Sequence, residues 1–168
     1  MKIYLKVKPF RQKPGESTCG PASLKIVLDY YGIHASEKEL ARLAKTTKRL
    51  GTGLKGLVKA AKKSGLKTSV KDNSSFLDVE RWLKQGVPPI VDWFTRGRKD
   101  YSDSEIADGH YSVVCGIDAK HIYLQDPELG GVRKMAKNDF KRVWFDFPGE
   151  FIKPSELIVQ RLIAAYPR

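Results

Sequence analysis

One cysteine of this sequence lies at a position where a thiol can act as a nucleophile. Cys19 stands in the segment TCGPASLKIVLDYYG, in which Pro21 suits the first turn of a helix and Gly32 suits its C-terminal cap. Unpaired backbone N–H groups and the helix dipole favour an anion at a helix start, and the thiolate is the reactive form of cysteine. Cys19 is therefore a candidate nucleophile, and Gly20 beside it allows other atoms to approach. The alternative is a small apolar residue buried at a helix start.

A histidine and an aspartate of the second half are candidates to assist this thiol. His110 lies at the start of a predicted strand, residues 111–117, from which its ring can project towards Cys19. Asp126 follows the next predicted strand, residues 121–125, and the ends of two such strands meet across a hairpin. Asp126 is therefore placed to hold the second ring nitrogen of His110, although an Asp-Pro pair is also a common turn start.

The polar segment before the cysteine, QKPGEST, offers a further hydrogen-bond donor in Gln12. An amide aimed at a developing oxyanion contributes about 2.7 to 4 kcal/mol to the stability of a transition state. Gln12 is the candidate for this role, and an ordinary loop glutamine is the alternative. The other histidines, His34 in an expected turn between helices and His121 at the far end of the hairpin, are expected to be structural.

The spacing of apolar residues predicts helices in the first half of the chain and strands in the second. Helices are expected at residues 19–31, 36–45, 54–64 and 76–84, and strands at 3–7, 66–70, 87–94, 111–117, 121–125 and 132–135. Residues 157–166 suit either strand or helix, and residues 95–108 suit a mobile surface loop beside the site. This order predicts an α+β fold in which a helical half, about 1–86, packs on an antiparallel sheet half, about 87–168.

The composition indicates a globular chain that is large enough to fold without disulfide bonds or a structural metal. With 168 residues, 41% of them hydrophobic, a single domain over 1–168 is expected. No apolar run is long enough for a signal peptide or a membrane span, so we expect a cytoplasmic protein. Two cysteines in such a setting are expected to be separate thiols, and Cys115, in SVVCGI, is expected to be a packed core residue.

Other patterns in the sequence do not point to a site. The net charge of +12 is compatible with attraction to nucleic acid, lipid or an acidic protein, but the basic residues are scattered without base-reading spacing. Gly51, Gly53 and Gly56 spell GxGxxG after a helical segment, which suits a loop and not a dinucleotide site. The pair Gly130-Gly131 suits a turn between strands, and the absence of CxxC and HxxxH spacing argues against a metal site.

Together these residues resemble the C39-type cysteine peptidases, bacterial proteins with a papain-like fold. The resemblance rests on Gln12, TCGPASLKIVLDYYG, GHYSVVCGID and LQDPELGG, and it extends to about residue 144. It implies that Cys19 is the nucleophile, His110 the general base, Asp126 the orienting residue and Gln12 the oxyanion-hole donor. It also implies acyl transfer without a cofactor, in which the thiolate attacks a peptide carbonyl and water releases the acyl-enzyme.

The resemblance implies a peptide or protein substrate. Family members attached to export transporters cut leader peptides after a Gly-Gly pair, and this chain, without a transporter region, resembles the stand-alone branch. We therefore expect a cysteine peptidase with leader-type peptides as one substrate class. Three alternatives remain: a catalytically inactive peptide-binding module on the same fold, a basic nucleic-acid-associated protein, and amide transfer to an acceptor other than water. The oligomeric state is not indicated.

Overall fold

The computed structural model of the protein describes residues 2–95 and 108–167. Its helices are α1 (Cys19–Tyr30), α2 (Glu37–Ala44), α3 (Leu54–Lys63), α4 (Phe76–Lys84) and α5 (Lys137–Val143), with a 3₁₀ turn, η1, at Pro154–Glu156. Its strands are β1 (Ile3–Tyr4), β2 (Leu66–Lys71), β3 (Ile90–Phe94), β4 (Gly109–Ile117), β5 (His121–Asp126), β6 (Gly131–Ala136), β7 (Phe145–Asp146), β8 (Ile158–Val159) and β9 (Leu162–Pro167). Most helical residues precede the run of strands from β3 to β6, as the sequence predicts.

Strands from both halves of the chain share one antiparallel sheet. The order is β2-β9-β3-β4-β5-β6, and β1 pairs with the end of β4 that β3 leaves free. The last strand, β9, lies between β2 and β3, so the C-terminal segment is internal to the sheet. A separate pair, β7 and β8, lies beside it. Helices packed on an antiparallel sheet confirm the predicted α+β class.

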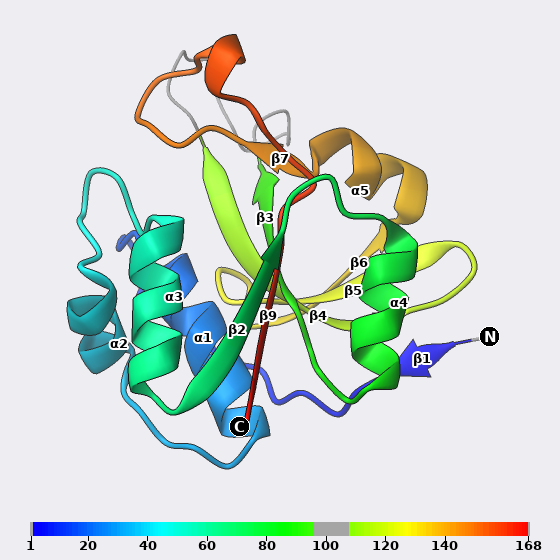
Figure 1. Ribbon diagram of the computed structural model, residues 1–168, viewed down its shortest axis with the longest axis horizontal. Helices are drawn as coiled ribbons and strands as arrows, with labels where there is room; N and C mark the ends of the chain where they lie inside the picture. The colour runs from blue at the N-terminus through cyan, green and yellow to red at the C-terminus, as the bar shows by residue number, and fades with distance from the viewer. Residues whose placement is uncertain (1, 96–107, 168) are drawn as a thin grey trace.

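Helices cover both faces of this sheet. Figure 1 shows α1, α2 and α3 together on one side, and α4 and α5 on the other. Along β4, Val113 and Cys115 pack with the first group of helices, whereas Val114 between them packs with the second. A strand buried on both faces is apolar throughout, which explains the run SVVCGI and confirms Cys115 as a core residue.

Helix α1 is the central helix of its layer and carries the candidate nucleophile at its first position. Ala22, Leu24, Val27 and Leu28 are fully buried, and the helix packs against α2, α3 and β4. A helix that is apolar nearly all round lies inside a fold and not on its surface. The chain leaves α1 at Gly32, whose φ of 73° is one that glycine adopts without strain.

Several predicted boundaries differ from the observed ones for physical reasons. The strand expected at 87–94 begins only at Ile90, because Pro88 and Pro89 have no N–H to donate to a ladder. The ambiguous segment 157–166 forms β8 and β9, and the short helix α5 was not predicted. Residues 96–107 of the expected loop lie outside the described residues. In the part of the chain that the structure describes, no helix has the length and apolarity that crossing a membrane requires.

The contact between α2 and α3 explains one glycine of the GxGxxG pattern. A Cβ on Gly56 would lie 2.1 Å from the carbonyl oxygen of Ala44, the last residue of α2. Alanine normally stabilises a helix by about 1 kcal/mol relative to glycine. Here the backbone oxygen has to move, so we expect Gly56→Ala to lower the free energy of unfolding by about 1 to 3 kcal/mol. Urea denaturation measures this change.

Gly131→Ala is the matched control, because a Cβ at Gly131 would meet no atom within 4 Å. Its midpoint of denaturation is expected to stay near that of the wild type. Equal midpoints for the two variants would contradict the close approach of α2 and α3.

Candidate active site

Cys19 begins helix α1 at the end of a loop that is tied to α2. The Thr18 hydroxyl donates to Glu37 Oε1 at 2.5 Å, and the Lys13 amide donates to the same oxygen at 3.2 Å. Thr18 therefore does not cap α1 with its side chain. The first N–H groups of a helix have no partner within the helix, and Pro21 has no N–H at all. The amides of Cys19 and Gly20 are therefore the donors at this helix start, where the helix dipole favours negative charge.

His110 bridges this thiol and a buried carboxylate. Its Nε2 lies 2.6 Å from Asp126 Oδ1, and the Cys19 side chain acts on the same ring by raising its pKa. The Trp93 ring packs edge-on against the imidazole at 5.5 Å, from the strand position directly opposite. The structure therefore brings the side chains of Cys19, His110 and Asp126 together, and their roles stay a prediction.

Asp126 is fully buried and has partners on both oxygens. Besides His110, its Oδ1 accepts from the Glu128 amide at 3.1 Å, and its Oδ2 accepts from Arg133 Nε at 2.8 Å. The sequence analysis missed Arg133. Strand alternation was the available signal. Gly131 is the register partner of Asp126, and Arg133, two residues after Gly131, points to the same face of the sheet as Asp126.

These contacts set the charges of the pair. Burial alone lowers the pKa of His110, but hydrogen bonds with Asp126 and Cys19, together with their charges, raise it to about 10. Burial likewise raises the pKa of Asp126, but the hydrogen bonds and charges of His110 and Arg133 lower it to about 2. At neutral pH the imidazole is therefore protonated and the carboxylate ionised, so the cleft holds an imidazolium beside a thiol.

Gln12 lies in the same cleft as the thiol, on the loop before α1. Its amide N–H donates to the Pro127 carbonyl at 2.8 Å, which fixes the loop to the residue after Asp126. Its side-chain Nε2 donates to the Glu16 carbonyl at 2.9 Å, and one further Nε2 hydrogen remains for another acceptor. A turn at Pro14 and Gly15, with φ of 75° at the glycine, lies in the segment between Gln12 and Cys19.

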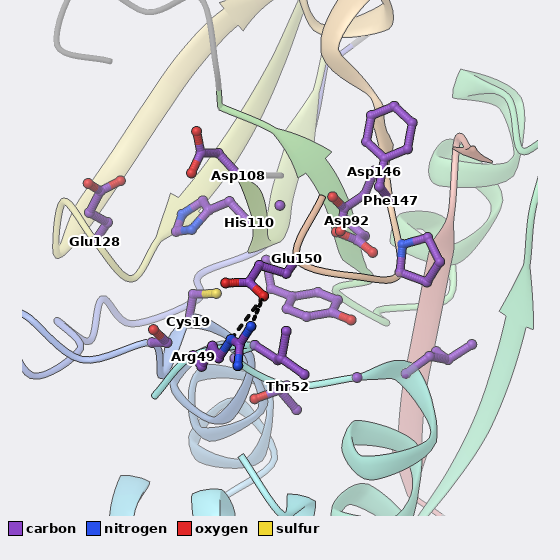
Figure 2. A pocket seen from close by; sticks show the side chains of 18 of the residues that line it. Cys19, Arg49, Thr52, Asp92, Asp108, His110, Glu128, Asp146, Phe147 and Glu150 are labelled. Atoms are coloured by element: carbon purple, nitrogen blue, oxygen red, sulfur yellow. Dashed lines mark hydrogen bonds and ion pairs between the residues drawn. The ribbon is translucent and has the colours of Figure 1, made fainter. Parts of the chain in front are cut away.

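The side chains of Cys19 and His110 line a cleft of about 870 Å³ between the first helices and the sheet (Figure 2). Thr52 packs directly against Gly20, where a Cβ would come within 2.8 Å of the Thr52 Cβ. The predicted close approach at Gly20 is therefore made by this side chain. Across the mouth of the cleft, Arg49 forms an ion pair with Glu150, 101 positions later in the chain.

Two further acids, Asp92 of β3 and Asp146 of β7, also line the cleft. The sequence analysis missed both of them. Asp92 had a signal, because it interrupts the apolar strand IVDWF and is buried there. Asp146 had none, since it stands in a short polar and aromatic stretch of the kind that surface loops contain.

One group of described residues near this site has atoms of the kind that bind metals, but most of those atoms already contact protein groups. Ligand atoms of His110, Asp126 and Glu128 lie within 4.8 Å of one another. However, His110 Nε2 and both oxygens of Asp126 already bind protein groups. His34 is exposed and His121 lies at the opposite end of the hairpin, beside Asp118, as expected.

The raised pKa of His110 yields a direct prediction. Asp126→Asn removes the charge that favours the imidazolium, so the pKa of His110 is expected to fall by about 1 to 3 units. An NMR titration of the His110 ring in the wild type and the variant measures this change. Asp118→Asn, which removes a carboxylate at the far end of the hairpin, is the control and should leave the His110 titration unchanged. An unaltered titration in Asp126→Asn would contradict the account.

Comparison with known proteins now adds to this geometry. The sequence profile of the peptidase C39 family matches residues 7–147. An uncharacterized protein of Methanothermobacter marburgensis is 36% identical over 123 residues, which are 73% of this chain and 73% of that protein. The transport/processing ATP-binding protein ComA of Streptococcus pneumoniae R6 is 32% identical over 137 residues, covering 80% of this chain but only 17% of ComA.

The fold agrees with these matches. The crystal structure of the peptidase domain of Streptococcus ComA, a bifunctional ABC transporter, superposes with a TM-score of 0.71 at 26% identity. The superposition covers 96% of this chain and 99% of that domain. This similarity over nearly all of both chains bears out the papain-like α+β fold that the sequence implied. Sequence profile, relatives and fold agree, and the chain belongs to the peptidase C39 family.

Proposed function

We propose that this protein is a cysteine peptidase that hydrolyses a peptide bond through Cys19, His110 and Asp126. One observation carries the proposal: the same imidazole lies 2.6 Å from a buried carboxylate and has its pKa raised by the Cys19 thiol that lines the same cleft. This is the arrangement that nucleophilic catalysis by cysteine requires, with a base beside the nucleophile and a third group that orients the base. Membership of the C39 family supports the same assignment.

The proposed mechanism starts from the ionised form of Cys19 beside the His110 imidazolium. The Cys19 thiolate attacks the carbonyl carbon of the peptide, and the carbonyl oxygen takes the negative charge. The His110 imidazolium then gives its Nδ1 proton to the leaving nitrogen, so the C–N bond breaks and a thioester to Cys19 remains. Neutral His110 next removes a proton from water, whose oxygen attacks the thioester; the C–S bond breaks, which releases the carboxylic acid and restores the Cys19 thiolate beside the His110 imidazolium. Asp126 stays ionised throughout and holds the ring in place.

Two donors are candidates for the oxyanion. Gln12 lines the same cleft as the thiol and keeps one Nε2 hydrogen, and the backbone amide of Cys19 stands at the start of α1. Each donor of this type contributes about 2.7 to 4 kcal/mol when it meets charge that develops in the transition state. Gln12 is held for this purpose by the Glu16 carbonyl and by the anchoring of its own amide to Pro127.

The proposed substrate is a peptide that lies in the cleft in an extended form. Family members attached to transporters cut leader peptides after a Gly-Gly pair, and one relative of this chain is named a transport/processing protein. We therefore take peptides with a Gly-Gly pair before the cleaved bond as the first substrates to test.

Turnover of such a peptide tests the proposal. The wild type is expected to cleave a fluorogenic Gly-Gly peptide, and Cys19→Ala is expected to lose at least about 10³-fold in kcat, because the nucleophile is absent. Cys115→Ala is the matched control, since Cys115 is a buried core thiol outside the cleft, and it should retain turnover. A thioester at Cys19, trapped by acid quench and found by mass spectrometry, is the expected intermediate. Binding without turnover by the wild type would favour the inactive alternative.

The assignment of Gln12 is tested separately. Gln12→Ala is expected to lower kcat by about 10² to 10³-fold with little change in KM, because the lost donor acts mainly in the transition state. Gln85→Ala, which alters an exposed glutamine after α4, is the control and should leave both constants unchanged. A rise in KM at constant kcat would assign Gln12 to substrate binding instead.

A further inference from the structure

Two carboxyl groups on the wall of the cleft take no part in the proposed chemistry. Asp92 is only 2% exposed, whereas Asp146 is half-buried, and both line the cleft that holds Cys19. Figure 2 shows the two side chains next to each other on the side of the cleft away from Glu128. They come from adjacent strands, β3 and β7, and they hydrogen-bond each other.

These two acids have unused hydrogen-bonding capacity. Oδ1 of Asp92 and Oδ1 of Asp146 are both buried, and neither has a hydrogen-bond partner among the described residues. A buried acceptor without a donor is destabilising, and such groups in native proteins usually have a specific explanation. An acceptor on the wall of a substrate cleft has a natural one, because the substrate can supply the missing donor.

The carboxyl of Asp146 is also held in its place by packing. A Cβ built on Gly109 would lie 2.1 Å from Asp146 Oδ2, so the carboxyl rests directly on the backbone that precedes His110. On the other strand, Asp92 is the register partner of Tyr111, one residue after His110. The acid pair therefore lies against the backbone of the strand that carries His110.

Burial shifts the pKa of both carboxyl groups upward. Burial, followed by the charge of Asp146 and a hydrogen bond with it, raises the pKa of Asp92 well above its usual range. Burial also raises the pKa of Asp146, although less, because the hydrogen bonds with Asp92 and the Phe147 amide favour its ionised form. Ionisation of Asp146 therefore makes it harder for Asp92 to ionise, as in other close carboxyl pairs.

Among the described residues, the groups that face the pair supply no cation bound to it. Cys19 of α1, Tyr111 of β4 and Asp108 before β4 face the pair, and none of them is a cation at neutral pH. Arg161 acts on it from the segment before β9, but its guanidinium makes two hydrogen bonds, of 2.7 and 2.8 Å, with Asp72. Within the described part of the chain, the acid pair makes no ion pair with a Lys or Arg side chain.

We propose that Asp92 and Asp146 form a cation-binding subsite, which receives an ammonium or guanidinium group of the substrate beside the Cys19 thiol. The inference rests on the proposed peptidase function and narrows its substrate class to peptides with a basic group near the cleaved bond. That group is the side chain of a Lys or Arg residue or a free α-amino group. Its N–H donors supply partners for the carboxylate oxygens that lack one, and its positive charge favours the ionised form of the pair.

Binding of a cation at this subsite is coupled to a proton. The incoming charge stabilises the ionised form of Asp92, so the proton of Asp92 is released into solution as the ligand binds. Affinity for a basic ligand therefore rises with pH, whereas affinity for a neutral isostere does not. A pair that served only to tie β7 to β3 would show neither effect.

Calorimetry on Cys19→Ala tests the subsite without any cleavage. The probes are acetylated hexapeptides with a central Gly-Gly pair, in which lysine or its neutral isostere norleucine occupies each other position in turn. Hexapeptides with a free N-terminus distinguish an α-amino group from a side chain. At one position we expect lysine to bind about 10 to 100-fold more tightly than norleucine. Titration in two buffers of different ionisation enthalpy should detect release of up to one proton.

Two isosteric variants in the Cys19→Ala background locate the effect. Asp92→Asn resembles the protonated acid and keeps a donor for Asp146, so the fold is retained, but proton release should vanish. Asp146→Asn should reduce the lysine preference to about threefold or less. Glu39→Gln removes an exposed carboxylate on α2 and controls for net charge.

The proposal is overturned if no lysine or free-amine peptide binds more tightly than its neutral partner. It is equally overturned if the preference survives in both aspartate variants. Failure of the wild type to cleave any of these peptides would instead count against the peptidase function, because the binding measurements do not depend on turnover.

Discussion

The site depends on keeping one imidazole charged in a place where burial alone would discharge it. His110 is buried, and its charge is held by Asp126, whose own buried carboxylate is held in turn by Arg133 and the Glu128 amide. Arg133, which is partly exposed, compensates for the burial of the Asp126 carboxylate. Asp126 in turn compensates for the burial of the charged His110 ring beside the thiol. If one member is removed, a buried charge is left without its partner.

This constraint explains why the site is built across three strands and a helix. Residues on β4, β5 and β6 must keep register for His110, Asp126 and Arg133 to meet, and the hairpins that join these strands fix that register. Helix α1 packs against the same strand β4, so Cys19 at its first position is held at the end where His110 lies. Helices and apolar side chains pack on both faces of the sheet that carries these strands.

Much of this arrangement could be predicted from sequence, because it rests on local patterns. Helical spacing with Pro21 and Gly32 located α1, and two alternating runs with a turn located the hairpin that brings Asp126 to His110. Partners set by tertiary packing alone could not be found. Asp92 and Asp146 lie far apart in sequence, and the burial of β9 between two strands removed the alternation that would have identified it as a strand. The catalytic roles themselves remain proposals that rest on geometry and family membership.

The central claim is that the imidazolium of His110 activates Cys19, and the alkylation rate of that thiol tests it most directly. Iodoacetamide reacts with thiolates, so the second-order rate constant at Cys19 reports activation without requiring a substrate. At pH 6 to 7 the wild type is expected to react at least about tenfold faster than His110→Asn, in which a neutral side chain of similar shape replaces the imidazolium. Equal rate constants for the two proteins would contradict the account.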